Sequence, residues 1–180
     1  MQASRTSRYR PSLVALHWLT LLLLIGVYAC IELRGMYPRG SAARALIKDW
    51  HYALGLAVFA LTWLRLALRA TGTTPPILPQ PPAWQAGLAH LVAFLLYAML
   101  LALPVLGYLS LNADGHAVVL LGIEFPRLIA ENPALAHNLE EIHETIGTAG
   151  YFLIGLHASA ALLHHYVRRD NALRRMSLRG

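Results

Sequence analysis

The chain has 180 residues, of which 57% are hydrophobic and only 13% are charged. Its mean hydropathy of +0.48 exceeds that of ordinary soluble domains and predicts an integral membrane protein. The formal net charge of +6 does not indicate nucleic-acid binding, because the basic residues lie at the ends of apolar segments rather than in one patch. The single cysteine, Cys30, excludes a disulfide, a four-cysteine zinc site and a cysteine-ligated iron–sulfur cluster within the chain.

Four segments are apolar over about 20 residues, the length that a helix needs to cross a bilayer. They predict helices at about 11–33, 49–69, 84–111 and 140–168, within one domain that covers residues 1–180. No small-residue cleavage site follows the first segment, which is expected to remain as a membrane helix. Short connections favour an all-α, up-down-up-down four-helix bundle.

The three connections differ in composition. The first, residues 34–49, is short and basic, and the second contains TTPPILPQPP, whose prolines favour an extended backbone and stop the second helix. The third, residues 112–140, is the longest. We expect it to place a short helix over the outer face.

The distribution of charge predicts the orientation of the bundle. With the N-terminus in the cytoplasm, ten of the fifteen Lys and Arg residues lie on the cytoplasmic side, and eight of the nine acids lie outside. These ten are Arg5, Arg8, Arg10, Arg65, Arg69, Arg168, Arg169, Arg174, Arg175 and Arg179. The positive-inside rule therefore favours cytoplasmic termini, although the basic first connection opposes it.

Four of the nine histidines match in depth and face. His143 and His157 lie 14 residues apart in IHETIGTAGYFLIGLH, so they share one helix face at two levels about 21 Å apart. His17 lies one to two turns into the first helix at the level of His157, and His51 begins the second helix from the outside at the level of His143. The sequence therefore predicts two pairs of histidines, each drawn from two helices.

Several kinds of site fit such pairs. A buried histidine on its own is often only a hydrogen-bonded polar residue, and a zinc or copper site would need a third or fourth ligand in the same layer. Two imidazoles on opposite sides of a porphyrin fill both axial positions of haem iron, which suits electron transfer. Gly55, Gly147, Gly150 and Gly155 alone would indicate close helix packing, but together with the histidine spacing they better fit backbone that leaves room for a flat ring. The paired histidines favour two haems b.

The sequence resembles the bacterial cytochrome b561 family, and within it the superoxide oxidase branch. The similarity covers nearly the whole chain and includes LHW at 16–18, ELRGMYP at 32–38, WLRLALR at 63–69, TPPILP at 74–79, GLAH at 87–90, ALPVLG at 102–107, HETIGTAGYFLIGLHASAALLHHY at 143–166 and DNALRRM at 170–176. The resemblance implies a bacterial inner-membrane enzyme with two haems b that oxidises superoxide outside the membrane and passes the electrons to ubiquinone. It also implies His17 and His157 as ligands of the inner haem, and His51 and His143 as ligands of the outer haem.

Basic residues near the outer haem could attract superoxide, which is an anion. The candidates are Arg34, Arg39, Arg44, Lys48 and Arg127. Lys48 is preferred because it precedes His51 by three residues, although ordinary solvated charge or contact with lipid headgroups explains any one of them equally well. Arg65, 14 residues after His51, could pair with a haem propionate at the inner level or extend to the headgroups.

The remaining histidines divide by position. His164 and His90 lie toward the cytoplasmic side and could bind ubiquinone or deliver its protons, or merely cap the helices at the interface. A quinone site on the outer face near Trp50 is the rival placement. His116 and His137 fall in the third connection and are expected at the surface.

Two other functions fit the same pattern. One is a cytochrome b subunit that anchors a dehydrogenase or hydrogenase complex and receives electrons from a docked protein. The other is a histidine-lined transporter of protons or metal ions without haem. In the leading interpretation the chain acts on superoxide and ubiquinone within lipid, without a partner protein.

Overall fold

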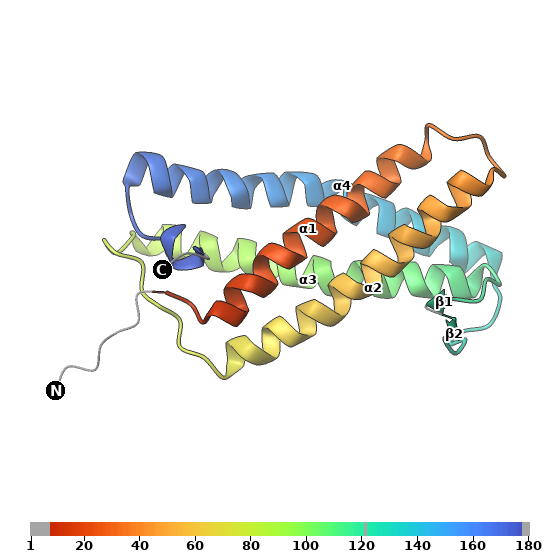
Figure 1. Ribbon diagram of the computed structural model, residues 1–180, viewed down its shortest axis with the longest axis horizontal. Coiled ribbons are helices and arrows are strands. Elements are labelled where there is room, and N and C mark those ends of the chain that lie inside the picture. Colours follow the sequence, from red (N-terminus) through yellow and green to blue (C-terminus); the bar gives the residue numbers. More distant parts are fainter. Residues whose placement is uncertain (1–7, 121, 178–180) are drawn as a thin grey trace.

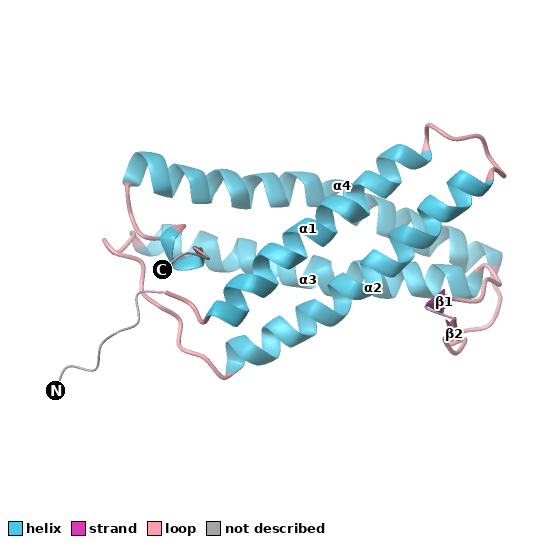
Figure 2. Cartoon of the chain, in the orientation of Figure 1, coloured by secondary structure: helices cyan, strands magenta, loops and turns pink. Residues whose placement is uncertain are grey.

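The computed structural model describes residues 8–120 and 122–177, apart from the side chain of Leu120. Four long helices dominate the fold: α1 (Pro11–Arg34), α2 (Ala42–Ala70), α3 (Ala83–Ala113) and α4 (Pro133–Leu163). A π-helical turn η1 (His164–Arg168) continues α4, and a short 3₁₀ turn η2 (Arg174–Met176) follows (Figures 1 and 2). Arg5 and Arg179, which contributed to the predicted orientation, lie outside the described residues.

The helices alternate in direction, as predicted for an up-down-up-down bundle (Figure 1). The helix pair α1–α2 packs along its length, as does the pair α3–α4, and the two pairs cross. The terminal end of the bundle holds the start of α1, the end of α4 and the loop between α2 and α3. The hairpin end, opposite, holds the other two connections.

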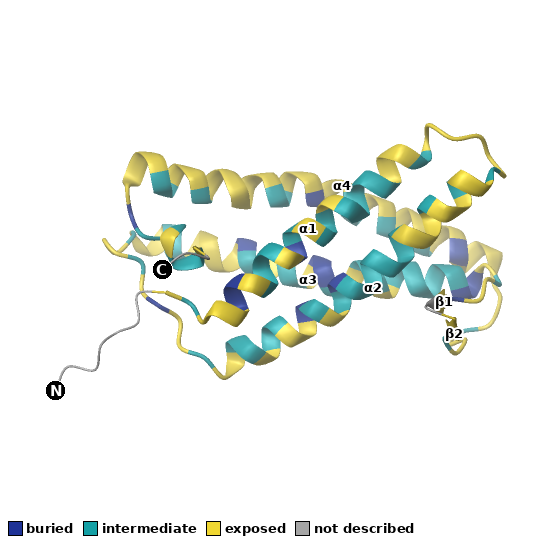
Figure 3. Cartoon of the chain, in the orientation of Figure 1, coloured by how far each residue is buried: buried dark blue, intermediate teal, exposed yellow. Residues whose placement is uncertain are grey.

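Each of the four helices is long and apolar enough to cross a membrane. Few side chains are buried, and the small core consists of Val58, Met99 and Leu100 with partly buried neighbours. Exposed residues lie along all four helices (Figure 3). Many of them have large apolar side chains, such as Phe94 and Phe152. In lipid these side chains contact acyl chains rather than water, so their exposure is consistent with a membrane-spanning bundle.

Two helices begin earlier than the apolar pattern indicated. Helix α2 begins at Ala42 rather than about residue 49, because the side chain of Ser41 accepts a hydrogen bond from the Arg44 amide. Helix α4 begins at Pro133 rather than about residue 140, because Asn132 caps the Leu135 amide and proline suits the first helical position. Polar residues, Arg44 and Lys48 in α2 and His137 and Asn138 in α4, interrupt the apolar pattern of these first turns, so hydropathy did not reveal them.

The prediction of a short helix in the third connection was wrong. The segment instead contains a two-stranded antiparallel hairpin, β1 (Val119–Leu120) with β2 (Ile123–Glu124). Gly122 adopts a φ of 79°, which glycine favours in a tight turn. Arg127 donates to the carbonyl of Gly115 and to the carboxylate of Glu131, and both bonds fasten this connection.

The C-terminal segment folds back across the terminal end and joins two motifs that are far apart in the sequence. Asn171 exchanges hydrogen bonds with the backbone of Leu78 and donates to the carbonyl of Pro76, while the guanidinium of Arg175 donates to the carbonyl of Pro75. The indole of Trp18 donates to the Met176 carbonyl at 2.8 Å. The DNALRRM and TPPILP motifs therefore bind each other through these hydrogen bonds.

Candidate functional site

The first histidine pair lies toward the terminal end and joins α1 to α4. The ring centres of His17 and His157 are 6.2 Å apart, and the ring planes are inclined by 64°. Trp18 packs edge-on against His17, with ring centres 5.4 Å apart. The Nδ1 atom of His17 is buried and has no hydrogen-bond partner among the described residues.

The second pair lies toward the hairpin end and joins α2 to α4. The ring centres of His51 and His143 are also 6.2 Å apart, with an interplanar angle of 68°. The Nδ1 atom of His51 lies 3.1 Å from the Val27 carbonyl, and that of His143 lies 3.0 Å from the Leu103 carbonyl. Because a carbonyl only accepts, each Nδ1 must carry the proton, which leaves a lone pair on Nε2.

Both pairs bridge helices that are not sequence neighbours. Helix α4 makes few close backbone approaches to α1 or α2, so the facing rings occupy space between the two helix pairs. Each pair could hold one metal ion between its rings. Among the described residues no group of three or more His, Cys, Asp or Glu side chains could hold a metal ion, so neither pair has the further ligand of a zinc or copper site.

The glycines near the pairs differ in their surroundings. A Cβ atom added at Gly55, Gly147 or Gly155 would meet nothing within 4 Å, consistent with open space for a flat ring. The expectation of such space was wrong for Gly150, where a Cβ would collide with the Tyr28 hydroxyl and with Met99 Sδ. Gly150 instead permits close packing, because Tyr28 reaches over it to donate to the Gly147 carbonyl at 2.9 Å.

A tyrosine pair between the two levels of histidines went unnoticed in the sequence. The rings of Tyr28 and Tyr151 have centres 4.4 Å apart, and the Tyr151 hydroxyl donates to Glu32 at 2.5 Å. These contacts, with the Tyr28 bond to α4, connect α1 to α4 across the crossing of the helix pairs. No periodicity links residues so far apart in the chain.

A second feature that sequence reasoning missed is Gly107 of α3. A Cβ atom there would lie 3.3 Å from Cε1 and 3.4 Å from Nδ1 of His143. Glycine therefore lets this ring approach α3 closely enough to reach the Leu103 carbonyl one turn away. The ALPVLG motif, which contains both residues, was the only signal in the sequence.

Arg65 lies at the level of the His17–His157 pair, as its spacing predicted. It interacts electrostatically with both histidines, and its guanidinium lies 5.4 Å from the centre of the Tyr97 ring. It is partly buried rather than extended into solvent. The position places a positive charge beside the first pair.

The basic residues at the hairpin end have different roles in the fold. Arg44 donates to the carbonyls of Arg34 and Tyr37 and so completes the end of α1. The side chains of Lys48 and Arg39 are exposed and make no hydrogen bond or ion pair with any described residue. Lys48 lies on the first turns of α2, one turn before His51.

His164 and His90, expected to share a quinone site, are not brought into contact. His164 is mostly buried, and its Nδ1 lies 2.5 Å from the carboxylate of Asp170. His90 is exposed on α3. Trp50, which marks the rival placement, is exposed at the hairpin end of α2, and His116 and His137 are exposed as expected.

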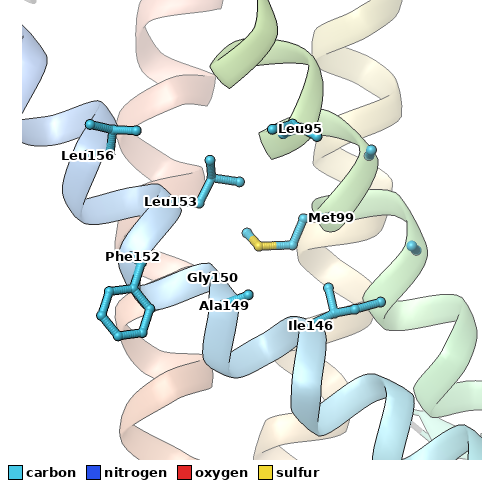
Figure 4. Close-up of a pocket in the computed structure, with 10 residues that line it drawn as sticks. Leu95, Met99, Ile146, Ala149, Gly150, Phe152, Leu153 and Leu156 are labelled. Atoms are coloured by element: carbon cyan, nitrogen blue, oxygen red, sulfur yellow. The ribbon is translucent and has the colours of Figure 1, made fainter.

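An apolar groove between α3 and α4 lies apart from these polar residues. It has a volume of about 540 Å³. Met99 extends into it from α3 toward α4, where Ala149 and Gly150 line the groove (Figure 4). Its lining contains no histidine or charged side chain. It therefore offers a surface to hydrocarbon and no polar contact to a ligand.

Known proteins are similar in sequence to this chain over nearly its whole length. The family model for prokaryotic cytochrome b561 matches residues 8–178. Cytochrome b561 homolog 1 of Escherichia coli is 40% identical over 94% of this chain and 97% of its own length. The probable superoxide oxidase CybB of Yersinia pestis is 38% identical over 94% and 95%, and cytochrome b561 homolog 2 of Escherichia coli is 26% identical over 94% and 90%. This chain belongs to the prokaryotic cytochrome b561 family.

Proposed function

We propose that the chain is a di-haem b oxidoreductase of the bacterial inner membrane that oxidises superoxide on the periplasmic side and reduces ubiquinone. Two superoxide ions each lose one electron to become oxygen, and one ubiquinone takes up both electrons and two protons. The observation that carries the proposal is the presence of two histidine pairs, each 6.2 Å between ring centres, at two levels of one membrane bundle. The family binds haem b, and one relative is named as a probable superoxide oxidase.

The ring spacing fits axial ligation. The centre of an imidazole ring lies about 1.1 Å from its nitrogens, which bind transition metals at about 2.0–2.1 Å, so two rings that held one metal ion between them would have centres at most about 6.2–6.4 Å apart. Both observed separations agree with this value. In the proposal His17 and His157 hold one haem, and His51 and His143 hold the other.

The protein's own groups then orient and separate these two sites. When bound, the haems would supply one-electron carriers without an open axial position. Backbone carbonyls hold the rings of His51 and His143 with Nε2 free to bind metal. Arg65 is placed to neutralise a propionate near His17 and His157. The Tyr28 bond to α4 keeps the helix pairs in register between the two sites.

The free cations at the hairpin end support superoxide as the donor. Lys48 and Arg39 keep their charges exposed in the connection and first turns that lead to His51, and a local positive charge raises the concentration of an anion beside it, although eight of the nine acids lie at the same end of the bundle. Arg44 is also positively charged, but its guanidinium already donates to two carbonyls, so we expect it to attract superoxide less than Lys48 and Arg39 do. Arg34 and Arg127 complete the set, although Arg127 is paired with Glu131.

The terminal end is our proposed site of ubiquinone reduction. His164 lies seven residues beyond His157 on a similar face, and its Asp170 partner can hold a proton-bearing imidazole in place. A quinone entering from lipid would meet this face, with His90 of α3 at the same end. An imidazole can act as a general acid that delivers protons to a bound quinone.

A second candidate is an electron-transfer subunit anchored to a dehydrogenase or hydrogenase. Exposed apolar side chains at the hairpin end, Met36, Val119 and Ile123, favour it because a docked donor could cover them. This function needs the same histidines and differs only in the donor.

Reduction of the purified protein by superoxide separates the two functions. An enzymatic superoxide source should reduce the haems within seconds and then reduce added ubiquinone, and superoxide dismutase should abolish both signals. Haems that respond only to dithionite would exclude superoxide oxidation and favour the anchor subunit. A preparation without a Soret band would exclude both.

The same assay tests the charge at Lys48. In Lys48→Gln the rate of reduction by superoxide should fall several-fold at low ionic strength and approach that of the unmodified protein at high salt, because screening removes electrostatic attraction. Arg174→Gln, at the opposite end, is the matched control and should not change the rate.

Orientation is testable by fusion of a reporter that is active only in the periplasm. Fused after Gly180 it should be silent, and inserted between Gly115 and His116 it should be active, because the positive-inside rule places the arginine-rich terminal end in the cytoplasm. The reverse pattern would place the terminal end in the periplasm and the hairpin end in the cytoplasm.

A further inference from the structure

The two histidine pairs differ in what holds their rings. His51 and His143 each donate through Nδ1 to a backbone carbonyl, at 3.1 and 3.0 Å. Neither His17 nor His157 makes a ring hydrogen bond to any described residue, and Nδ1 of His17 is buried without a partner. The asymmetry belongs to the fold, because the accepting carbonyls come from α1 and α3.

Such hydrogen bonds change the ligand as well as orienting it. A carbonyl that accepts from Nδ1–H draws the proton outward and makes the opposite nitrogen more basic. A more basic imidazole donates more charge to iron and favours the oxidised form, so the reduction potential falls. Both ligands of the hairpin-end site have this support, and neither ligand of the other site does.

Fixed charges act in the same direction. Arg65 interacts with both His17 and His157, and a nearby cation favours the reduced, less positive iron. Glu140 and Glu144 interact with His143, whereas Arg34 interacts with His51. Among the described residues, Glu140, Glu144 and Arg34 are therefore the charged side chains that act on the hairpin-end histidines, and Arg65 is the one that acts on the terminal-end histidines.

We infer that the His51–His143 site has the lower reduction potential of the two and that Gly107 of α3 is a positioning residue that maintains it. This inference rests on the proposed haem ligation. Gly107 acts through His143: its lack of a side chain lets the ring reach the Leu103 carbonyl. Electrons that enter at the hairpin end would then move spontaneously toward the terminal end.

Gly107→Ala is the direct test. The added Cβ would lie 3.3 Å from Cε1 of His143, so the ring must give way by a few tenths of an ångström, and we expect its hydrogen bond to the Leu103 carbonyl to lengthen. Alanine favours a helix more than glycine does, so the substitution does not threaten α3 itself. Gly87→Ala, on the same helix with nothing within 4 Å of the added atom, is the matched control.

Spectroscopic redox titration of purified protein, with haem content measured separately, gives the readout. We expect two waves, of which the lower should be missing in His143→Ala, should shift upward in Gly107→Ala and should stay unchanged in Gly87→Ala. Arg65→Gln, a second and independent variant, should lower the upper wave only. Loss of the upper wave in His143→Ala would overturn the inference, as would a two-haem Gly107→Ala protein with unshifted waves. An unmodified protein with fewer than two haems would instead overturn the ligation on which the inference rests.

Discussion

His157→Ala should yield a protein that binds one haem instead of two, and His143→Ala should do the same at the other site. Each histidine supplies one of only two side chains that face each other across its gap, and no third ligand among the described residues can replace it. Loss of either site should interrupt electron transfer across the bundle and reduce superoxide-driven ubiquinone reduction to background. Haem per polypeptide and the low-spin spectrum are the measurements.

His137→Ala is the control for these variants. His137 lies on the same helix, six residues before His143, but its side chain is exposed and pairs only with Glu141. It should keep both haems and full activity. If His157→Ala or His143→Ala retained two haems with unchanged low-spin spectra, the ligand assignment would be wrong.

His164→Ala should keep both haems and their reduction by superoxide, while ubiquinone reduction falls by about 10²-fold, the lower range for loss of a general acid. The buried imidazole lies beyond His157 at the terminal end, held at 2.5 Å from Asp170, where it can supply protons to a quinone. Stopped-flow kinetics separate haem reduction by superoxide from haem reoxidation by ubiquinone. Only the second rate should fall.

His164 also binds Asp170 of the C-terminal segment, so His164→Ala could act by loosening that segment, and a control variant must test this. Asn171→Ala removes the side-chain bonds to Leu78 and Pro76 without changing His164. If Asn171→Ala slowed ubiquinone reduction equally, the effect of His164 would be to hold the segment rather than to supply protons. Normal reoxidation in His164→Ala, together with slow reoxidation after substitution of Trp50, would move the quinone site to the hairpin end.

The sequence by itself determined the class of protein, the number of spans and the levels of the four paired histidines. These features follow from properties of single helices: apolar length decides whether a helix can cross a membrane, and the 3.6-residue repeat decides which side chains share a face. His143 and His157 were therefore predictable as one face at two depths. Their partners on α1 and α2 followed from the alternation of spans.

Hydropathy did not locate the starts of α2 and α4 or the hairpin in the third connection. The first turns of α2 and α4 are held by Ser41 and Asn132 and project beyond the apolar segments. The hairpin at Val119–Glu124 depends on a turn at Gly122 rather than on an extended pattern. Local side-chain caps and turn geometry decided both features.

Only the tertiary structure decided what surrounds each histidine. Gly107 and the Leu103 carbonyl lie against His143, the Val27 carbonyl lies against His51, and Gly150 is filled rather than open. The arrangement also ties Arg44 to α1 and pairs His164 with Asp170. Such contacts join residues tens of positions apart through the crossing of two helix pairs, and no periodicity within one helix encodes where another helix will present its carbonyls.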